Sequence, residues 1–262
     1  MRAIAPNPRT LLLAALSLAG FTTPAFAQSA KQDALSSYAS VLSRYVEGGD
    51  VRYGLLVTEN PPEWRRYLAW LETAQPEAMS IDERRAFWIN AYNARVIAGV
   101  LERYPIDSVR DVGYLGGRLR GFFSRREHPV AGEVRTLDEI EREILFQPPL
   151  WDPRIHFALN CAARSCSKLR SEPYDASRLD TQLDFQTRTF LNGPDGHRID
   201  PAARVLYVSR VLKWYREDFE QAAGSLREYL IRNLTGEAAA AARDPGWEIV
   251  FLDYDWSLND FL

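Results

Sequence analysis

The sequence predicts an α+β fold in which N-terminal helices and a long buried central helix pack on an antiparallel sheet. Helical periodicity is concentrated in the first half of the chain, and the longest helical stretch is apolar nearly all round. The extended stretches are short, scattered and arranged as hairpins around turn residues, without the alternation of strands and helices typical of parallel sheets.

Three helices are expected in the first half, over residues 31–46, 63–74 and 81–104. The third should open with a capping box, because Ser80 is followed three residues later by Glu83, and it should end before Pro105. Its centre reads FWINAYNARVIAGV, and apolar residues around the whole helix predict that it is buried.

The second half mixes short strands and helices. Thr136 and Glu139 predict a further capping box. Hairpins are expected over residues 122–134 and 197–208, single extended segments over 51–57, 155–159 and 247–254, and helices over 137–146, 176–191, 212–219 and 226–234, with a linker or helix end at 238–242.

The first 27 residues have the features of a cleaved secretory signal. Arg2 and Arg9 precede an apolar run at residues 11–21, and Ala25-Phe26-Ala27 is typical of a cleavage site. The run is too short to span a bilayer, and no later span is evident. We expect residues 28–262 to form a single exported domain, periplasmic or secreted.

Composition argues against several classes of protein. The formal net charge of −3 is unfavourable for general nucleic-acid binding. The three histidines and two cysteines lack paired metal-ligand spacing, and no glycine-rich nucleotide loop is present. We therefore expect no metal, no cofactor and no nucleic-acid partner, whereas a small-molecule or peptide substrate is compatible with the sequence.

Both cysteines lie in residues 152–170, which read DPRIHFALNCAARSCSKLR. Cys161 follows the extended segment predicted at 155–159, with His156 a few residues upstream, an arrangement that a cysteine nucleophile requires. Arg164 would favour the thiolate, and the N–H groups of the turn would stabilise an oxyanion. The same spacing fits a structural Cys161–Cys166 disulfide, which an oxidising compartment favours. Both interpretations remain open.

Five sequence blocks together resemble the family of domain of unknown function 547 (DUF547). In chain order they are FWINAYNA, TLDEIE, IHFALNCAARSC, VLKWYREDF and YDWSLN, and they span about residues 85 to 260. The resemblance implies an α+β fold of the papain and transglutaminase class, which pairs a thiol with an imidazole and an orienting polar group. The family commonly has Gly where this chain has Ala162 and often Pro in place of Ser167. Its members do not all carry the second cysteine, which favours Cys161 as the shared position.

Candidate roles follow for several side chains besides Cys161. His156 is the expected general base, although five residues separate it from Cys161 and a regular strand would place the two on opposite faces; His128 is the alternative base. Glu141 or Asp255 would orient the imidazole. The substrate-binding candidates are Asn90, Asn93 and Arg164.

The sequence is therefore compatible with two functions. The first is a cysteine-dependent hydrolase or acyl transferase that acts on an amide, peptide or thioester. The second is a non-catalytic periplasmic binding or scaffold domain with a Cys161–Cys166 disulfide, in which arginines at 118, 120, 125 and 126, beside Phe122 and Phe123, help to hold an anionic ligand.

Overall fold

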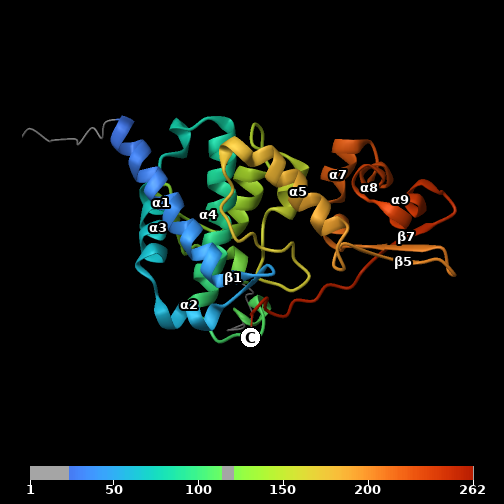
Figure 1. The fold of residues 1–262 in the computed structure, drawn as a ribbon, viewed down its shortest axis with the longest axis horizontal. Helices are drawn as coiled ribbons and strands as arrows, with labels where there is room; N and C mark the ends of the chain where they lie inside the picture. The colour runs from blue at the N-terminus through green and yellow to red at the C-terminus, as the bar shows by residue number, and fades with distance from the viewer. Residues whose placement is uncertain (1–23, 114–120, 262) are drawn as a thin grey trace, which may run out of the picture.

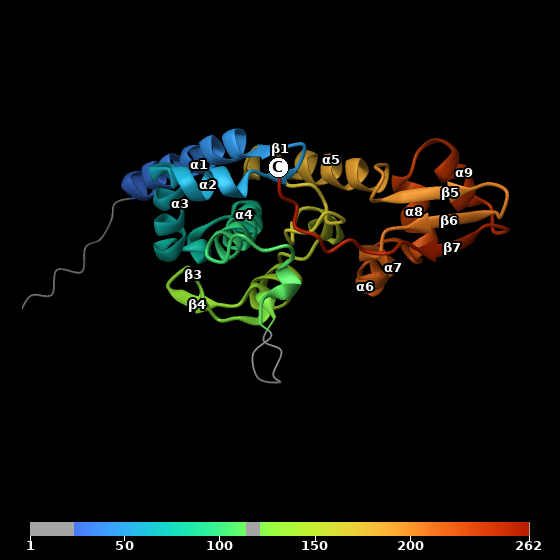
Figure 2. The same ribbon diagram turned by 90° about the horizontal axis from the view of Figure 1, so that it is seen from below.

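The computed structural model describes residues 24–113 and 121–261 (Figure 1). Residues 1–23 of the signal segment predicted over 1–27, and the arginines at 118 and 120, lie outside these ranges. The described chain is α+β, with two lobes and a returning C-terminal segment that joins them (Figure 2). None of the described helices is long and apolar enough to cross a membrane.

Helices dominate the helical lobe, which we define as residues 24–178. Its elements in chain order are α1 (Pro24–Tyr45), β1 (Val46–Glu47), β2 (Asp50–Val51), α2 (Tyr53–Glu59), α3 (Pro62–Thr73), η1 (Pro76–Ala78), α4 (Ile81–Leu101), η2 (Val109–Asp111), η3 (Phe122–Ser124), β3 (His128–Val130), β4 (Glu133–Arg135), η4 (Glu139–Leu145), η5 (Pro153–Phe157) and η6 (Ala176–Arg178).

Helix α4 is the centre of this lobe. The predicted capping box is confirmed, because Ser80 Oγ accepts the Glu83 N–H and the Glu83 carboxylate accepts the Ser80 N–H. Side chains from Ala86 to Val100 are buried, as the apolar pattern predicted. The helix packs mainly against α2, η1, η4 and η6. The antiparallel sheet predicted beside this helix is small: the helix meets the hairpin β3–β4, where Arg95 donates to the Pro129 carbonyl.

The sheet lobe, residues 192–251, is joined to the helical lobe by α5 (Leu179–Leu191). Its strands lie in the order β5-β6-β7, with β5–β6 antiparallel and β6–β7 parallel, so this sheet is mixed rather than purely antiparallel. Its elements are β5 (His197–Asp200), β6 (Val205–Val208), α6 (Val211–Trp214), α7 (Arg216–Ala223), α8 (Leu226–Asn233), α9 (Gly236–Arg243) and β7 (Glu248–Phe251).

After β7 the chain runs back from the sheet lobe to the helical lobe (Figure 2). The returning segment, residues 252–261, ends beside β2, where the N–H of Val51 donates to the Asn259 carbonyl and the N–H of Phe261 donates to the Val51 carbonyl. On the way it forms an antiparallel bridge between Leu258 and Ala163. A segment from the end of the sequence is thereby fixed against the cysteine turn.

Two local predictions are wrong, and a third is resolved. Residues 51–57 are mostly helical in α2. Residues 238–242, predicted as a linker or helix end, form the C-terminal part of α9. The strand predicted at 155–159 is the 3₁₀ helix η5, because Asp152 caps the Arg154 N–H at 2.9 Å and Pro153 occupies the first helical position. Because residues 155–157 are not a strand, the argument that His156 and Cys161 would point to opposite faces no longer applies.

Candidate functional site

A cavity of about 460 Å³ lies where the two lobes and the returning segment meet. The helical lobe contributes Cys161, Cys166, His156 and Glu141 to its lining, and later residues contribute Tyr215 and Tyr254. Aromatic rings form much of the remaining wall: Tyr92, Phe123, Phe146, Trp214 and Trp256. An apolar concave site with a few convergent polar groups has the features of a ligand or active site.

Asn93 of α4 holds the segment that leads to Cys161. Its amide group donates to the Ala158 carbonyl at 2.9 Å, and its oxygen accepts the Asn160 N–H at 2.8 Å. Asn160 in turn donates to the Ser167 carbonyl and accepts the Ala162 N–H. The cysteine turn, residues 160–167, is thus closed from inside the core, with Ala162 in the left-handed region at φ +59°.

The returning segment holds the same turn from outside. The N–H of Arg164 donates to the Ser257 carbonyl and that of Ser165 to the Asp255 carbonyl. Within the turn, the Cys166 N–H donates to the Ala163 carbonyl and the Cys161 N–H to Cys166 Sγ at 3.0 Å. These bonds, with that of the Ala162 N–H, occupy most of the turn N–H groups, whereas the Ala163 N–H donates to the Cys161 thiol. An oxyanion role for the turn stays a prediction.

The two cysteines are free thiols in contact with each other and with Tyr254. The Tyr254 hydroxyl is hydrogen-bonded to Cys161 Sγ at 3.1 Å. The hydrogen bond to the Cys166 thiol, together with burial, raises the pKa of Cys161 well above its ordinary value. Burial opposes ionisation of Cys166, but hydrogen bonds from the thiol and N–H of Cys161 outweigh it and lower the Cys166 pKa. Negative charge is therefore more stable on Cys166.

His156 is buried in the wall of the cavity and bound to a carboxylate. Its Nε2 lies 2.8 Å from Asp218 Oδ2, and its ring stacks on Tyr215 with 4.0 Å between centroids. Because a carboxylate only accepts, Nε2 carries the proton and Nδ1 is left as the basic nitrogen. Nδ1 has no hydrogen-bond partner among the residues that the structure describes. The His156 bond lowers the pKa of Asp218, so this carboxylate stays ionised.

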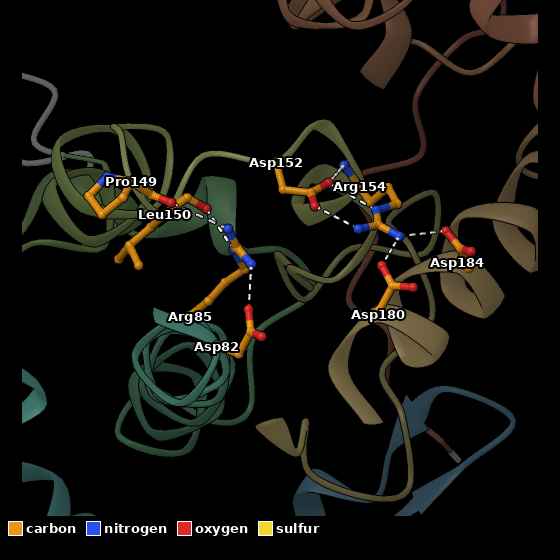
Figure 3. A network of polar contacts seen from close by, with 8 residues as sticks. All are labelled: Asp82, Arg85, Pro149, Leu150, Asp152, Arg154, Asp180 and Asp184. Atoms are coloured by element: carbon orange, nitrogen blue, oxygen red, sulfur yellow. Dashed lines mark hydrogen bonds and ion pairs between the residues drawn. The ribbon is translucent and has the colours of Figure 1, made fainter. Parts of the chain in front are cut away.

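Two arginines fix the chain just before His156 (Figure 3). Arg85 of α4 donates to the carbonyls of Pro149 and Leu150. Arg154 binds Asp152 through two nitrogens and reaches Asp180 and Asp184 of α5 at 2.8 and 2.6 Å. This network ties the start of η5 to both α4 and α5, which restricts where the imidazole can lie.

Glu141 does not orient the imidazole. It is buried in the π-helix η4, where its carboxylate accepts from the Tyr215 hydroxyl at 2.5 Å and the Tyr92 hydroxyl at 3.2 Å. Burial raises the pKa of Glu141 despite these hydrogen bonds. Tyr215 also stacks on His156, so Glu141 is linked to the imidazole through that tyrosine and by a charge–charge interaction, without a direct hydrogen bond. The orienting partner is Asp218.

Four other predicted site residues lie away from the cavity lining. Exposed Asp255 caps a turn by accepting from Ser257, and Arg164 points toward Asp50 and Asp260. His128 is buried on β3, near Gly99 of α4. Asn90 binds both backbone groups of Tyr174.

Asn93 supports the turn rather than lining the cavity. The sequence prediction missed Asp218, Tyr215 and Tyr254, although the first two lie in the VLKWYREDF block and the third begins YDWSLN. Those blocks were the available signal. Within residues 24–113 and 121–261, no group of three or more His, Cys, Asp or Glu side chains is placed to hold a metal ion.

Comparison with known proteins gives one family. Residues 76–191 match the model described as "Protein of unknown function, DUF547", which confirms the resemblance predicted from the sequence blocks. No curated protein and no solved structure matches the chain. The segment of residues 76–191, which holds Cys161, His156 and Glu141, is thus assigned to the DUF547 family of proteins of unknown function.

Proposed function

We propose that the cavity is the active site of an exported cysteine-dependent hydrolase or acyl transferase, related in fold to the papain and transglutaminase class and acting in the periplasm or after secretion. One observation carries the proposal. A half-buried thiol and an imidazole whose Nε2 is held by a carboxylate line the same cavity. A nucleophile, a base and an orienting group are the parts that such catalysis requires.

In this mechanism Cys161 attacks the carbonyl carbon of an amide, peptide or thioester. His156 Nδ1 takes the thiol proton and returns it to the leaving group, while Asp218 holds the ring and stabilises the imidazolium. The Tyr254 hydroxyl, beside the sulfur, donates to the developing oxyanion in place of the occupied turn N–H groups. Its raised pKa keeps this hydroxyl protonated.

The test uses p-nitrophenyl acetate as the acyl donor. The wild-type protein should release nitrophenolate in a burst and carry an acetyl group on Cys161, as located by peptide mass spectrometry. Cys161→Ala should abolish the burst and the adduct, whereas Asp255→Asn, outside the cavity, should retain both. A full burst in Cys161→Ala would rule out this mechanism.

A second function is favoured by different observations. Aromatic rings line much of the cavity, and most of the turn N–H groups are already bound, which fits a binding or scaffold domain. In that function the cysteines would form a structural disulfide. Thiol counting on the folded, unreduced protein separates the two functions. Two cysteines that react only after reduction favour the binding domain, and one fast-reacting thiol favours the enzyme.

A further inference from the structure

We propose that Cys161 and Cys166 form a reversible thiol–disulfide exchange site, at which an organic disulfide entering the cavity is reduced while the two cysteines become joined. The acyl-transfer mechanism uses only Cys161, and it leaves a second thiol beside the nucleophile without a role. The contacts around that second thiol point to exchange chemistry.

The first argument is geometric. The two thiols touch, and Cys166 Sγ accepts the Cys161 N–H at 3.0 Å. The turn that carries them is fixed from the core by Asn93 and Asn160 and from outside by the backbone of residues 255 and 257. Because the bonds from Asn93, Asn160 and the backbone of residues 255 and 257 do not involve the sulfur atoms, joining the sulfurs leaves these bonds in place. A pair held in this way can open and close without refolding.

The second argument is the difference in access. Cys161 is half-buried at the cavity, whereas Cys166 is 6% exposed. A small disulfide therefore meets Cys161 first, and Cys166 lies behind it. This arrangement is that of an attacking thiol and a resolving thiol.

The third argument concerns the charge. Hydrogen bonds from Cys161 lower the pKa of Cys166 and so favour a thiolate on the buried sulfur. That thiolate takes the proton of Cys161 as Cys161 attacks and passes it to the RS⁻ released in this first step, so that Cys166 is again the thiolate that the second step requires.

The exchange is balanced without a further reagent. Cys161 sulfur attacks one sulfur of R–S–S–R, which breaks that bond, forms Cys161–S–S–R and releases one RS⁻. Cys166 sulfur then attacks Cys161 sulfur, forms the Cys161–Cys166 bond and releases the second RS⁻. The protein is oxidised by two electrons and the disulfide is reduced by two; the single proton of the thiol–thiolate pair leaves with one released thiol, and the other leaves as RS⁻.

The test treats the reduced, folded protein with glutathione disulfide and follows intact mass. The wild type should lose the mass of two hydrogens and carry no glutathione. Cys166→Ser should stop at the first step, with one glutathione on Cys161. Cys161→Ser should react at roughly one tenth of the wild-type rate or more slowly still, because its remaining thiol is buried.

A wild-type protein that accumulates a glutathione adduct, or stays reduced, overturns the proposal. The proposal is also overturned if the Cys161–Cys166 bridge forms in urea but not in the folded protein. This comparison uses the wild type alone, so it remains decisive if a variant fails to fold. The consequence for acyl transfer rests on the proposed function: glutathione disulfide should abolish the nitrophenolate burst in the wild type and dithiothreitol should restore it. Absence of a burst in the reduced wild type would count against acyl transfer, while the mass result would still decide the exchange site.

Discussion

The family-matched segment, residues 76–191, and the later residues 192–261 contribute differently to the cavity. The matched segment provides Cys161, Cys166, His156 and Glu141, all groups with reactive or ionisable atoms. The later residues provide the partners of those groups, with Asp218 on the imidazole and Tyr254 on the thiol. The matched segment thus holds the reactive atoms, but their protonation and orientation depend on chain outside it.

The largest expected effect is that of Asp218→Asn, which tests whether residues 192–261 control the reactive groups of the matched segment. If the mechanism holds, the carboxamide no longer fixes Nδ1 as the basic nitrogen, because its NH₂ can donate to Nε2, and it carries no charge to stabilise the imidazolium. The acylation rate with p-nitrophenyl acetate should therefore fall by roughly 10²–10⁴. Asp255→Asn is the matched control, since Asp255 only caps a turn. An unchanged rate in Asp218→Asn would mean that the later residues do not contribute to the chemistry.

His128 is a contrasting titratable group, because it lies in the matched segment but outside the cavity. Burial, with further contributions from Arg95 and Arg103, lowers its pKa from 6.5 to about 4. The folded state therefore binds the proton less well than the unfolded state, so stability present above pH 6.5 is lost as the pH falls toward 4. The loss attributable to this group is about 3 kcal/mol.

Urea unfolding at pH 7 and pH 4.5 would measure that loss. Between the two pH values, the free energy of unfolding should fall less in His128→Gln than in wild type, whatever the stability of the variant at pH 7. The acylation rate of the variant should equal that of wild type. Equal losses in both proteins would contradict the assignment.

Asn93 tests whether the matched segment positions its own thiol. Asn93→Ala leaves the Ala158 carbonyl and the Asn160 N–H unpaired in the core, and the free energy of unfolding should fall by about 2–3 kcal/mol. The alkylation rate of Cys161 by iodoacetamide should change as well, because the turn loses its internal support. Ser43→Ala, an exposed site on α1, is the control for stability. A loss of stability without any change in alkylation would show that the turn is held from outside alone.

Local sequence signals predicted much of the fold. The capping boxes at Ser80 and Thr136 and the hairpin of residues 197–208 depend on residues a few positions apart, and the structure confirms them. Alternation at 155–159 was misleading, because the cap formed by Asp152 and Pro153 starts a 3₁₀ helix there. The sequence identified the thiols and His156, but the partner of His156 lies 62 residues further along, and no local pattern reports such a contact. Judged by charge alone, Glu141 and Asp255 were as good candidates for the carboxylate partner of His156 as Asp218.

The smallest expected effect is that of Glu141→Gln, which separates a buried acid from a catalytic one. Burial raises the pKa of Glu141, so its ionisation disfavours the folded state: stability present below the ordinary pKa is lost as the pH rises through the higher folded-state value. Glutamine keeps the shape and an oxygen that accepts from Tyr215 or Tyr92 while removing the charge. Unfolding free energy should change by about 1 kcal/mol or less at neutral pH, with a weaker pH dependence than in the wild type. The burst with p-nitrophenyl acetate should persist, because Glu141 is hydrogen-bonded to Tyr215 and Tyr92 and not to His156. Loss of the burst would place this carboxyl among the reacting groups and shift chemistry back into the matched segment.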